Sequence, residues 1–343
     1  MKPLDSFGMY EASAAFPEQV EAAALAAEDL DGLPGHEEIE HVVILGMGGS
    51  GIAGDVVAAV AGPFMPVPVV VAKGYEPPSF ISETTLCFAI SFSGETEETI
   101  EAASTAAAAG ARMVVVTGGG QLAHLATGWR SPRVHLPEGI PAPRAAMGAM
   151  AVPPLVALER AGLFPGASEW IALAVEQLRA RRQELTKEDN PARDLARRIG
   201  RTLPIVYAGN DLGAVAALRW KNQINENAKS PAFFAAIPEL THNEICGWGQ
   251  HGDVTRQVFT VLMLRHDHEH PQVMRRFDLV REWMDEVVAG IDEVKAEGDG
   301  PLAQLLDLML FGDFVSLHLA FEEGVDSGPV PILNHFKAEL ARQ

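Results

Sequence analysis

Short apolar runs alternate with helix-forming segments along the first half of the chain. Each run is rich in Val, Ile, Leu or Phe and is bounded by glycine or polar turn residues, which is typical of buried strands. The expected strands are 41–46, 67–72, 85–91 and 112–117, with an edge strand at 133–137. Helical spacing covers 9–31, 52–62 and 100–110. This alternation predicts a parallel sheet flanked by helices.

The second half of the chain restarts the same pattern. Residues 143–164 form a helical region interrupted at Pro153-Pro154, and 168–200 reads as an all-helical link. Strand, glycine turn and helix then follow over 203–228, and 205–217 echoes 43–55. Further elements are expected as strands at 257–265 and 291–296 and as helices at 271–290, 301–324 and 331–340. We therefore expect two similar α/β domains, 1–165 and 166–343.

Composition and net charge limit the classes of binding partner that we expect. The 343 residues are 48% hydrophobic, enough for two packed domains, and the formal net charge is -20. This charge repels nucleic acid and anionic membrane surfaces, so we expect neither as a partner. The first twenty residues have no apolar signal core, and there are only two cysteines. We expect a cytoplasmic protein without a disulfide framework.

A glycine-rich turn follows the first expected strand. Residues 46–55 read GMGGSGIAGD, which fits G-x-G-x-x-G, a dinucleotide-binding pattern. A dinucleotide site also needs an acid near the end of the next strand, but that strand ends in Ala72-Lys73. A site for a 2′-phosphorylated dinucleotide, which uses a cation there, stays open. The turn equally suits a smaller phosphate.

A second loop favours the smaller phosphate. ISFSGETEETIE places Ser91, Ser93 and Thr96 between a strand end and a helix start. Hydroxyls and free N–H groups at a helix N-terminus form an anion site without a lysine. Gly49 and Ser50 of the first loop are expected at the same carboxyl edge of the sheet. Alone, such a cluster is often only a helix cap; two together predict a phosphomonoester site.

Four stretches resemble one known family. SFSGETEET resembles the phosphate loop of sugar isomerase (SIS) domains, and GMGGSGIAGD resembles bifunctional phosphoglucose/phosphomannose isomerases of archaea and bacteria. Residues 141–148 and 225–248 resemble the same family. The resemblance covers nearly the whole chain as two SIS domains, each a flavodoxin-like three-layer α/β sandwich. It implies a phosphorylated hexose substrate, a homodimer, and no cofactor or metal.

The resemblance also implies catalytic roles. Glu226 matches the base that moves a proton between C1 and C2 of the sugar, and Arg144 matches the arginine that stabilises the enediolate. His242, borrowed from the partner subunit in this family, and Lys337 match the groups that open the sugar ring. Read without the resemblance, Glu226 is a helix-end carboxylate and His242 a loop histidine.

Two local features test this interpretation. Glu95 stands where many relatives have asparagine, and a carboxylate beside a phosphate is unfavourable unless it turns away or caps a helix. The run His266-Asp267-His268-Glu269-His270 offers metal-ligand residue types without the spacing of a known metal motif, so we expect no metal site.

Other functions are weighed against this one, and an isomerase for another phosphosugar and a sugar-phosphate sensor stay open as alternatives. A catalytically silent SIS protein would sense a sugar phosphate without needing Glu226, His242 and Arg144 together. An amino-transferring SIS enzyme would need an N-terminal glutaminase with a leading cysteine, whereas this chain starts MKPLDSF. A dehydrogenase would need the dinucleotide site discussed above.

Overall fold

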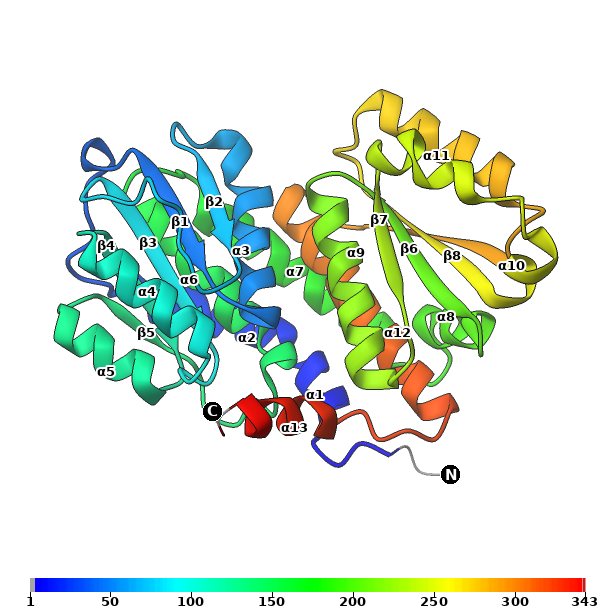
Figure 1. The fold of residues 1–343 in the computed structure, drawn as a ribbon, viewed down its shortest axis with the longest axis horizontal. Coiled ribbons are helices and arrows are strands. Elements are labelled where there is room, and N and C mark those ends of the chain that lie inside the picture. The colour runs from blue at the N-terminus through cyan, green and yellow to red at the C-terminus, as the bar shows by residue number, and fades with distance from the viewer. Residues whose placement is uncertain (1–3, 341, 343) are drawn as a thin grey trace. The chain divides into compact units, whose positions relative to one another are not determined.

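The computed structural model describes residues 4–340 and 342 and divides into two compact units (Figure 1). The N-terminal unit comprises Ala15–Arg181 and Ala296–Asp307. The C-terminal unit comprises the residues up to Ala14, Arg182–Lys295, and the residues from Leu308 onward. Each unit is built around its own parallel sheet.

The N-terminal unit contains a five-stranded parallel sheet in the order β2-β1-β3-β4-β5, which is the flavodoxin-like order. All five strands were expected from the sequence. They are β1 (His41–Leu45), β2 (Val69–Ala72), β3 (Thr85–Ser91), β4 (Arg112–Thr117) and β5 (Arg133–His135). Every residue of β3 is buried. Strands covered on both faces are apolar throughout rather than alternating, which is why these runs are so continuous.

Helices cover both faces of this sheet. Val43 and Leu45 pack with the buried alanines of α4 (Glu97–Ala108) and with α5 (Gly120–Trp129). On the opposite face, α3 (Gly48–Val60) lies so close that a Cβ on Gly54 would stand 2.9 Å from Ile44 Cγ2. The remaining helices are α2 (Phe16–Glu28), α6 (Met147–Arg160) and most of α7 (Ala167–Leu185). The expected three-layer arrangement is confirmed here.

The expected interruption at Pro153-Pro154 is wrong. Helix α6 runs through both prolines, and its residues 147–158 are all buried. An internal proline removes a helix hydrogen bond and crowds the preceding turn. Burial of this apolar helix against α2 and α3 offsets that cost.

The C-terminal unit contains a four-stranded parallel sheet in the order β7-β6-β8-β9. Its strands are β6 (Leu203–Gly209), β7 (Phe233–Ile237), β8 (Phe259–Arg265) and β9 (Gly290–Lys295). Helix α11 (Pro271–Met284) covers one face through Val273, Phe277 and Val280. The other helices are α1 (Met9–Ala14), α8 (Pro191–Ile199), α9 (Leu212–Gln223), α10 (Gly252–Val258) and α13 (Pro331–Leu340).

Several boundaries differ from the sequence-based expectation. Residues 9–31 form α1 and α2 rather than one helix, and 168–200 breaks between α7 and α8, where the Asn190 side chain caps α8. Helix α5, strand β7 and helix α10 were not expected. Helix α5 opens on three glycines and β7 is an edge strand with exposed Phe233, so local pattern identified neither.

Helix α12 (Pro301–Glu322) alone, among the residues the structure describes, is long and apolar enough to cross a membrane. Its whole apolar window is buried inside the protein. Core helices of globular proteins meet the same length and composition criteria, so the burial of α12 explains its apolar composition.

The two sheets place equivalent residues at equivalent positions. Leu45 of β1 pairs with Ala89 of β3, and Ala208 of β6 pairs with Leu264 of β8, with a glycine following Leu45 and Ala208. Ser91 lies two residues after Ala89, and His266 lies two residues after Leu264. Ser91 in one sheet therefore corresponds to His266 in the other.

The glycine turns show the same correspondence. Gly48 (φ +52°) and Asp211 (φ +62°) both take left-handed backbone two residues after the first glycine. Ser50 thus corresponds to Gly213. The Nε2 atom of His266 lies only 3.4 Å from where a Gly213 Cβ would stand, so the imidazole packs against the turn that would otherwise receive a hydroxyl.

Acid is expected to destabilise the C-terminal unit through two buried histidines. Burial lowers the pKa of His266 and of His318 from 6.5 to about 4, and nearby cations add to the effect. Between these values the unfolded chain binds more protons than the folded chain, so stability falls as the pH drops from 6.5 toward 4.

The measurement is the thermal midpoint across that pH window for wild type, His266→Phe and, as control, the exposed His124→Gln. We expect the midpoint of His266→Phe to fall less steeply than that of wild type, and the control to follow wild type. Equal slopes for all three proteins would contradict the role of His266.

Candidate active site

The two hydroxyl-rich loops leave the carboxyl ends of β1 and β3, which are neighbours in the N-terminal sheet. From β1 the chain proceeds through α3 to β2 on one side, and from β3 through α4 to β4 on the other. Such a point, where successive connections leave in opposite directions, is where open α/β sheets bind ligands.

The glycines of the first loop allow the backbone to approach closely. Gly48 has φ +52°, and α3 begins there, so the loop itself forms the first turn of the helix. A Cβ on Gly49 would lie 3.3 Å from the Pro143 carbonyl oxygen. The N-terminus of α3, with its free N–H groups, therefore lies beside the segment that carries Arg144.

Ser50 points into the N-terminal unit. Its side chain is 5% exposed, and its Oγ donates to Met150 Sδ at 3.3 Å. Thioether sulfur is a weak acceptor, so this contact satisfies the hydroxyl poorly. The same hydroxyl retains acceptor capacity for another donor.

The second loop gathers three hydroxyls before α4. Ser91 Oγ and Thr96 Oγ1 are hydrogen bonded at 2.9 Å, and Gly94 N donates to Ser91 Oγ at 3.1 Å. Glu95 N donates to Ser93 Oγ at 3.1 Å. Gly94 has φ +71°, and a Cβ there would lie 1.8 Å from the Gly119 carbonyl oxygen, so only glycine fits.

Glu95 is turned toward the neighbouring helix. Its Oε1 accepts a hydrogen bond of 2.9 Å from Gln121 N, at the start of α5. A carboxylate at a helix N-terminus is favoured by the free N–H groups and by the helix dipole. Glu95, which stands where many relatives have asparagine, therefore caps α5. The sequence pattern did not predict this helix.

The cation expected for a 2′-phosphorylated dinucleotide is already engaged. Lys73, directly after β2, forms an ion pair with Asp55 of α3. Burial raises the pKa of Asp55, and the Lys73 ammonium acts in the opposite direction. This pairing favours a structural role for Lys73 over dinucleotide binding.

Arg144 lies in the short helix η3 (Pro143–Ala145) of the same unit. The residue is 5% exposed. An arginine is rarely buried unless its guanidinium is paired or poised for an anion. The structure thus brings Arg144, Gly49 and Ser50 to neighbouring segments.

Glu226 occupies a π-helical turn in the C-terminal unit. This turn, η4 (Ile224–Ala228), continues directly from α9, and Glu226 is half-buried in it. The flanking asparagines hold the turn: Asn225 Nδ2 donates to the Ser230 carbonyl oxygen, and Asn227 Nδ2 donates to Ser316 Oγ, both at 2.9 Å. π-Helical turns inside α-helices are frequent at functional sites.

A buried carboxylate anchors the end of α9. Asp313 of α12 accepts hydrogen bonds from Arg219 Nη2 at 2.6 Å and Gln223 Nε2 at 2.7 Å, and all three side chains are at most 3% exposed. This group fixes the helix turn that precedes Glu226. The sequence analysis missed Asp313, although an acid inside the mostly apolar run 308–320 was a signal that a buried partner exists.

His242 ends the short helix η5 (Glu239–His242) and is exposed. Its loop is held by the buried Tyr207, whose hydroxyl donates to Glu244, and by Arg276 Nε, which donates to Thr241 Oγ1 at 3.2 Å. Burial, followed by the hydrogen bond to Glu244, raises the pKa of Tyr207, so the phenol stays protonated as the donor.

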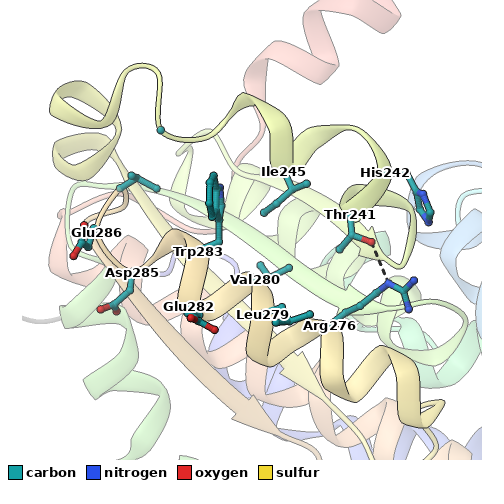
Figure 2. A pocket seen from close by; sticks show the side chains of 12 residues that line it. Thr241, His242, Ile245, Arg276, Leu279, Val280, Glu282, Trp283, Asp285 and Glu286 are labelled. Carbon is teal, nitrogen blue, oxygen red and sulfur yellow. Dashed lines mark hydrogen bonds between the residues drawn. The ribbon is translucent and has the colours of Figure 1, made fainter.

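His242 lies at one end of a groove of about 920 Å³ in the C-terminal unit (Figure 2). Thr241 and Ile245 form one side of it, and α11 contributes Leu279 and Trp283. Trp283 is 61% exposed, so the groove is open to solvent. An exposed histidine in an open groove is available to a ligand or to another chain.

Lys337 lies on α13, whose ten residues are all exposed. The C-terminal unit thus carries Glu226, His242 and Lys337, and the N-terminal unit carries the two loops and Arg144. In the run 266–270, the Glu269 carboxylate accepts hydrogen bonds from Arg265 and from His266 N. This residue of the metal-like run therefore serves to hold the end of β8.

Two family models match separate parts of the chain. The model of the SIS domain matches residues 37–127, and the model of the bacterial phospho-glucose isomerase C-terminal SIS domain matches residues 188–340. Among solved structures, tagatose-6-phosphate ketose/aldose isomerase from Escherichia coli superposes with a TM-score of 0.69 at 14% identity, covering 94% of this chain and 95% of that one. The expected pair of SIS folds is confirmed.

Sequence relatives extend over the whole chain. A bifunctional phosphoglucose/phosphomannose isomerase from Caldicellulosiruptor bescii is 34% identical over 337 residues, covering 97% of this chain and 99% of the relative. A protein of the same name from Aquifex aeolicus is 32% identical over 302 residues, covering 88% and 90%. With both SIS domains matched and the first relative aligned along its full length, this chain belongs to the bifunctional phosphoglucose/phosphomannose isomerase family.

Proposed function

We propose that this protein is an aldose–ketose isomerase that interconverts glucose 6-phosphate and mannose 6-phosphate with fructose 6-phosphate. The observation that carries the proposal is the pair of hydroxyl-rich loops at the carboxyl ends of β1 and β3, in a chain that belongs to this family. The N-termini of α3 and α4 supply local positive potential, which an anionic substrate needs on a chain of formal net charge -20.

In the proposed complex, Gly49, Ser50, Ser91, Ser93 and Thr96 hold the phosphate. Ser93 is exposed, so its hydroxyl can donate to a phosphate oxygen. The Ser50 hydroxyl would have to exchange its weak hydrogen bond to Met150 sulfur for one to the phosphate. Phosphate binding remote from the reacting carbons orients the sugar for the chemical step.

The proposed chemistry is a proton transfer through a cis-enediolate. In the open-chain aldose, the Glu226 carboxylate takes the proton from C2, and the C1 aldehyde oxygen becomes an enediolate oxygen. The C2 hydroxyl proton then passes to O1 and Glu226 returns its proton to C1, so that C2 becomes the ketone carbon. Arg144 stabilises the enediolate, and His242 and Lys337 open the ring. Both C2 epimers give the same enediolate, so one site can serve both. Neither metal nor redox cofactor takes part.

A binding-only SIS protein is the alternative from a different class. It would need the phosphate loops but not Glu226 on a turn fixed by Asn225, Asn227 and the Asp313 group. The hydrogen bonds that orient the Glu226 turn therefore support the enzyme.

We also propose that the protein acts in the cytoplasm. Cys87 and Cys246 are both free thiols in the structure, which is consistent with a reducing compartment.

We propose further that the enzyme is a homodimer in which each site uses His242 of the partner subunit. Helix α13 exposes an apolar face formed by Ile332, Leu333, Phe336 and Leu340, each 44–59% exposed. Residues at i, i+4 and i+8 lie on one side of a helix, and a contiguous exposed apolar face marks an interaction surface. Lys337 is on the same helix, so the interface would adjoin a catalytic group.

Purified, EDTA-treated protein is expected to form fructose 6-phosphate from glucose 6-phosphate and, in a separate assay, from mannose 6-phosphate. Glu226→Gln should reduce kcat at least about 100-fold, because the amide cannot accept the C2 proton, while sugar-phosphate binding persists. Turnover is measured by coupled assay and binding by thermal shift. Near-normal turnover by Glu226→Gln, or inactivation by EDTA, would contradict the mechanism; binding without turnover in wild type would identify a sensor.

Ser93→Ala is expected to raise KM more than it lowers kcat. The lost hydroxyl is proposed to bind the phosphate, which does not change during the reaction, so its binding energy is similar in the ground and transition states. Steady-state kinetics with glucose 6-phosphate check this, with Ser104→Ala on the middle of α4 as the matched control. A loss confined to kcat would place Ser93 in the chemical step instead.

Phe336→Glu is expected to convert the dimer to a monomer, measured by sedimentation velocity, whereas Leu25→Glu should not, although Leu25 of α2 is an even more exposed apolar residue. Mixing refolded or co-expressed Glu226→Gln and His242→Ala chains tests the shared site. Random pairing leaves one intact site in each mixed dimer, and hence about a quarter of wild-type activity. No recovery would show that His242 serves its own subunit.

A further inference from the structure

The ammonium group of Lys229 lies against the carbonyls that end the Glu226 turn. Lys229 Nζ donates to the Glu226 carbonyl oxygen at 2.7 Å and lies 3.4 Å from that of Asn227. The last carbonyls of a helical turn carry partial negative charge and lack intrahelical donors. A cation placed there satisfies these oxygens and fixes the peptide plane from which the Glu226 side chain extends.

The same ammonium also reaches a second segment. It donates to the Asp326 carbonyl oxygen at 2.9 Å and lies 3.4 Å from that of Ser327. Lys229 therefore ties the Glu226 turn to the connection between α12 and α13, so the position of the turn depends on that connection.

The connection is itself held in place. Asp326 Oδ1 accepts hydrogen bonds from Ser6 N at 3.1 Å and Gly328 N at 3.0 Å, and Ser327 Oγ donates to Asp5 Oδ1 at 2.9 Å. Asp5 in turn accepts from Met9 N at the start of α1. The carbonyls that Lys229 contacts therefore belong to a segment that is hydrogen bonded to residues 5 and 6.

Lys229 has a left-handed backbone conformation that is unusual for lysine. The residue adopts φ +55° and ψ +26°, a left-handed conformation that usually selects glycine or asparagine at the end of a helix. Glycine would relieve the backbone strain, but it would remove the ammonium. The presence of lysine at a position that suits glycine points to the ammonium contacts.

We propose that Lys229 is a positioning residue for the base Glu226, an inference that rests on the proposed isomerase function. Its ammonium holds the Glu226 peptide so that the carboxylate, after breaking the C2–H bond, stays aligned to form the C1–H bond with the same proton. A loosened carboxylate still removes the proton but loses it to water more often before returning it.

The experiment compares Lys229→Arg, Lys229→Met and Lys229→Gly, with exposed Lys187→Met as the control for loss of a surface charge. Glucose 6-phosphate deuterated at C2 is converted to fructose 6-phosphate, and the fraction of deuterium transferred to C1 is measured. The steady-state kcat, the KM and the thermal midpoint are measured alongside.

We expect Lys229→Met and Lys229→Gly to lower kcat about 10- to 100-fold and to lower the transferred fraction, with KM changed less than about threefold. Lys229→Arg keeps a cation and should retain most of the transfer. Lys229→Gly removes the ammonium without adding backbone strain, and its thermal midpoint shows whether a loss of activity comes with a loss of stability.

Wild-type transfer by folded Lys229→Gly or Lys229→Met would overturn the positioning role while leaving the proposed function intact. Absence of isomerisation in the wild-type and Lys187→Met proteins would instead overturn the proposed function. Since both controls run in the same assay, the two failures are distinguishable.

Discussion

The parallel pairing of β1 with β3 is the constraint on which the candidate site depends. It brings together the carboxyl ends of two strands whose following helices run to opposite sides, so the N-termini of α3 and α4 converge. Free backbone N–H groups at helix N-termini carry positive potential, so small side chains suffice to complete the proposed anion site. Both loops also pack closely against other segments, since a Cβ on Gly94 would meet the Gly119 carbonyl and one on Gly49 would approach Pro143.

The second sheet repeats this geometry and shows how few residues alter it. At the position of Ser91 stands His266, and at that of Ser50 stands Gly213, so a neutral imidazole occupies the turn. Both ring nitrogens of His266 are buried without a hydrogen-bond partner among the described residues. Burial of the ring lowers its pKa. The replacement of the two serines by His266 and Gly213 leaves this turn without the hydroxyls that a phosphate would need.

In the C-terminal unit, orientation is achieved with buried polar groups. Asp313 with Arg219 and Gln223, and Asn227 with Ser316, fix α9 and its π-helical turn against α12. Such buried groups contribute little net stability compared with apolar packing, because removing them from water is costly. These groups instead fix the orientation of α9 and its π-helical turn, since each hydrogen bond is satisfied in only one arrangement of its partners. Lys229 extends the same principle to the peptide of Glu226.

The alternation of strands and helices, the hydroxyl loops and the two-domain repeat could be predicted from the sequence, because apolar periodicity and turn chemistry act over a few residues. The family resemblance likewise rested on contiguous motifs. Local pattern did not reveal α5 or β7, the continuity of α6 through its prolines, or the partner of Glu95. Each depends on contacts between segments far apart in the chain. Only the tertiary structure decided that Glu95 caps α5, that His266 fills the second turn and that Lys229 holds Glu226, because strand register and helix packing bring these groups together.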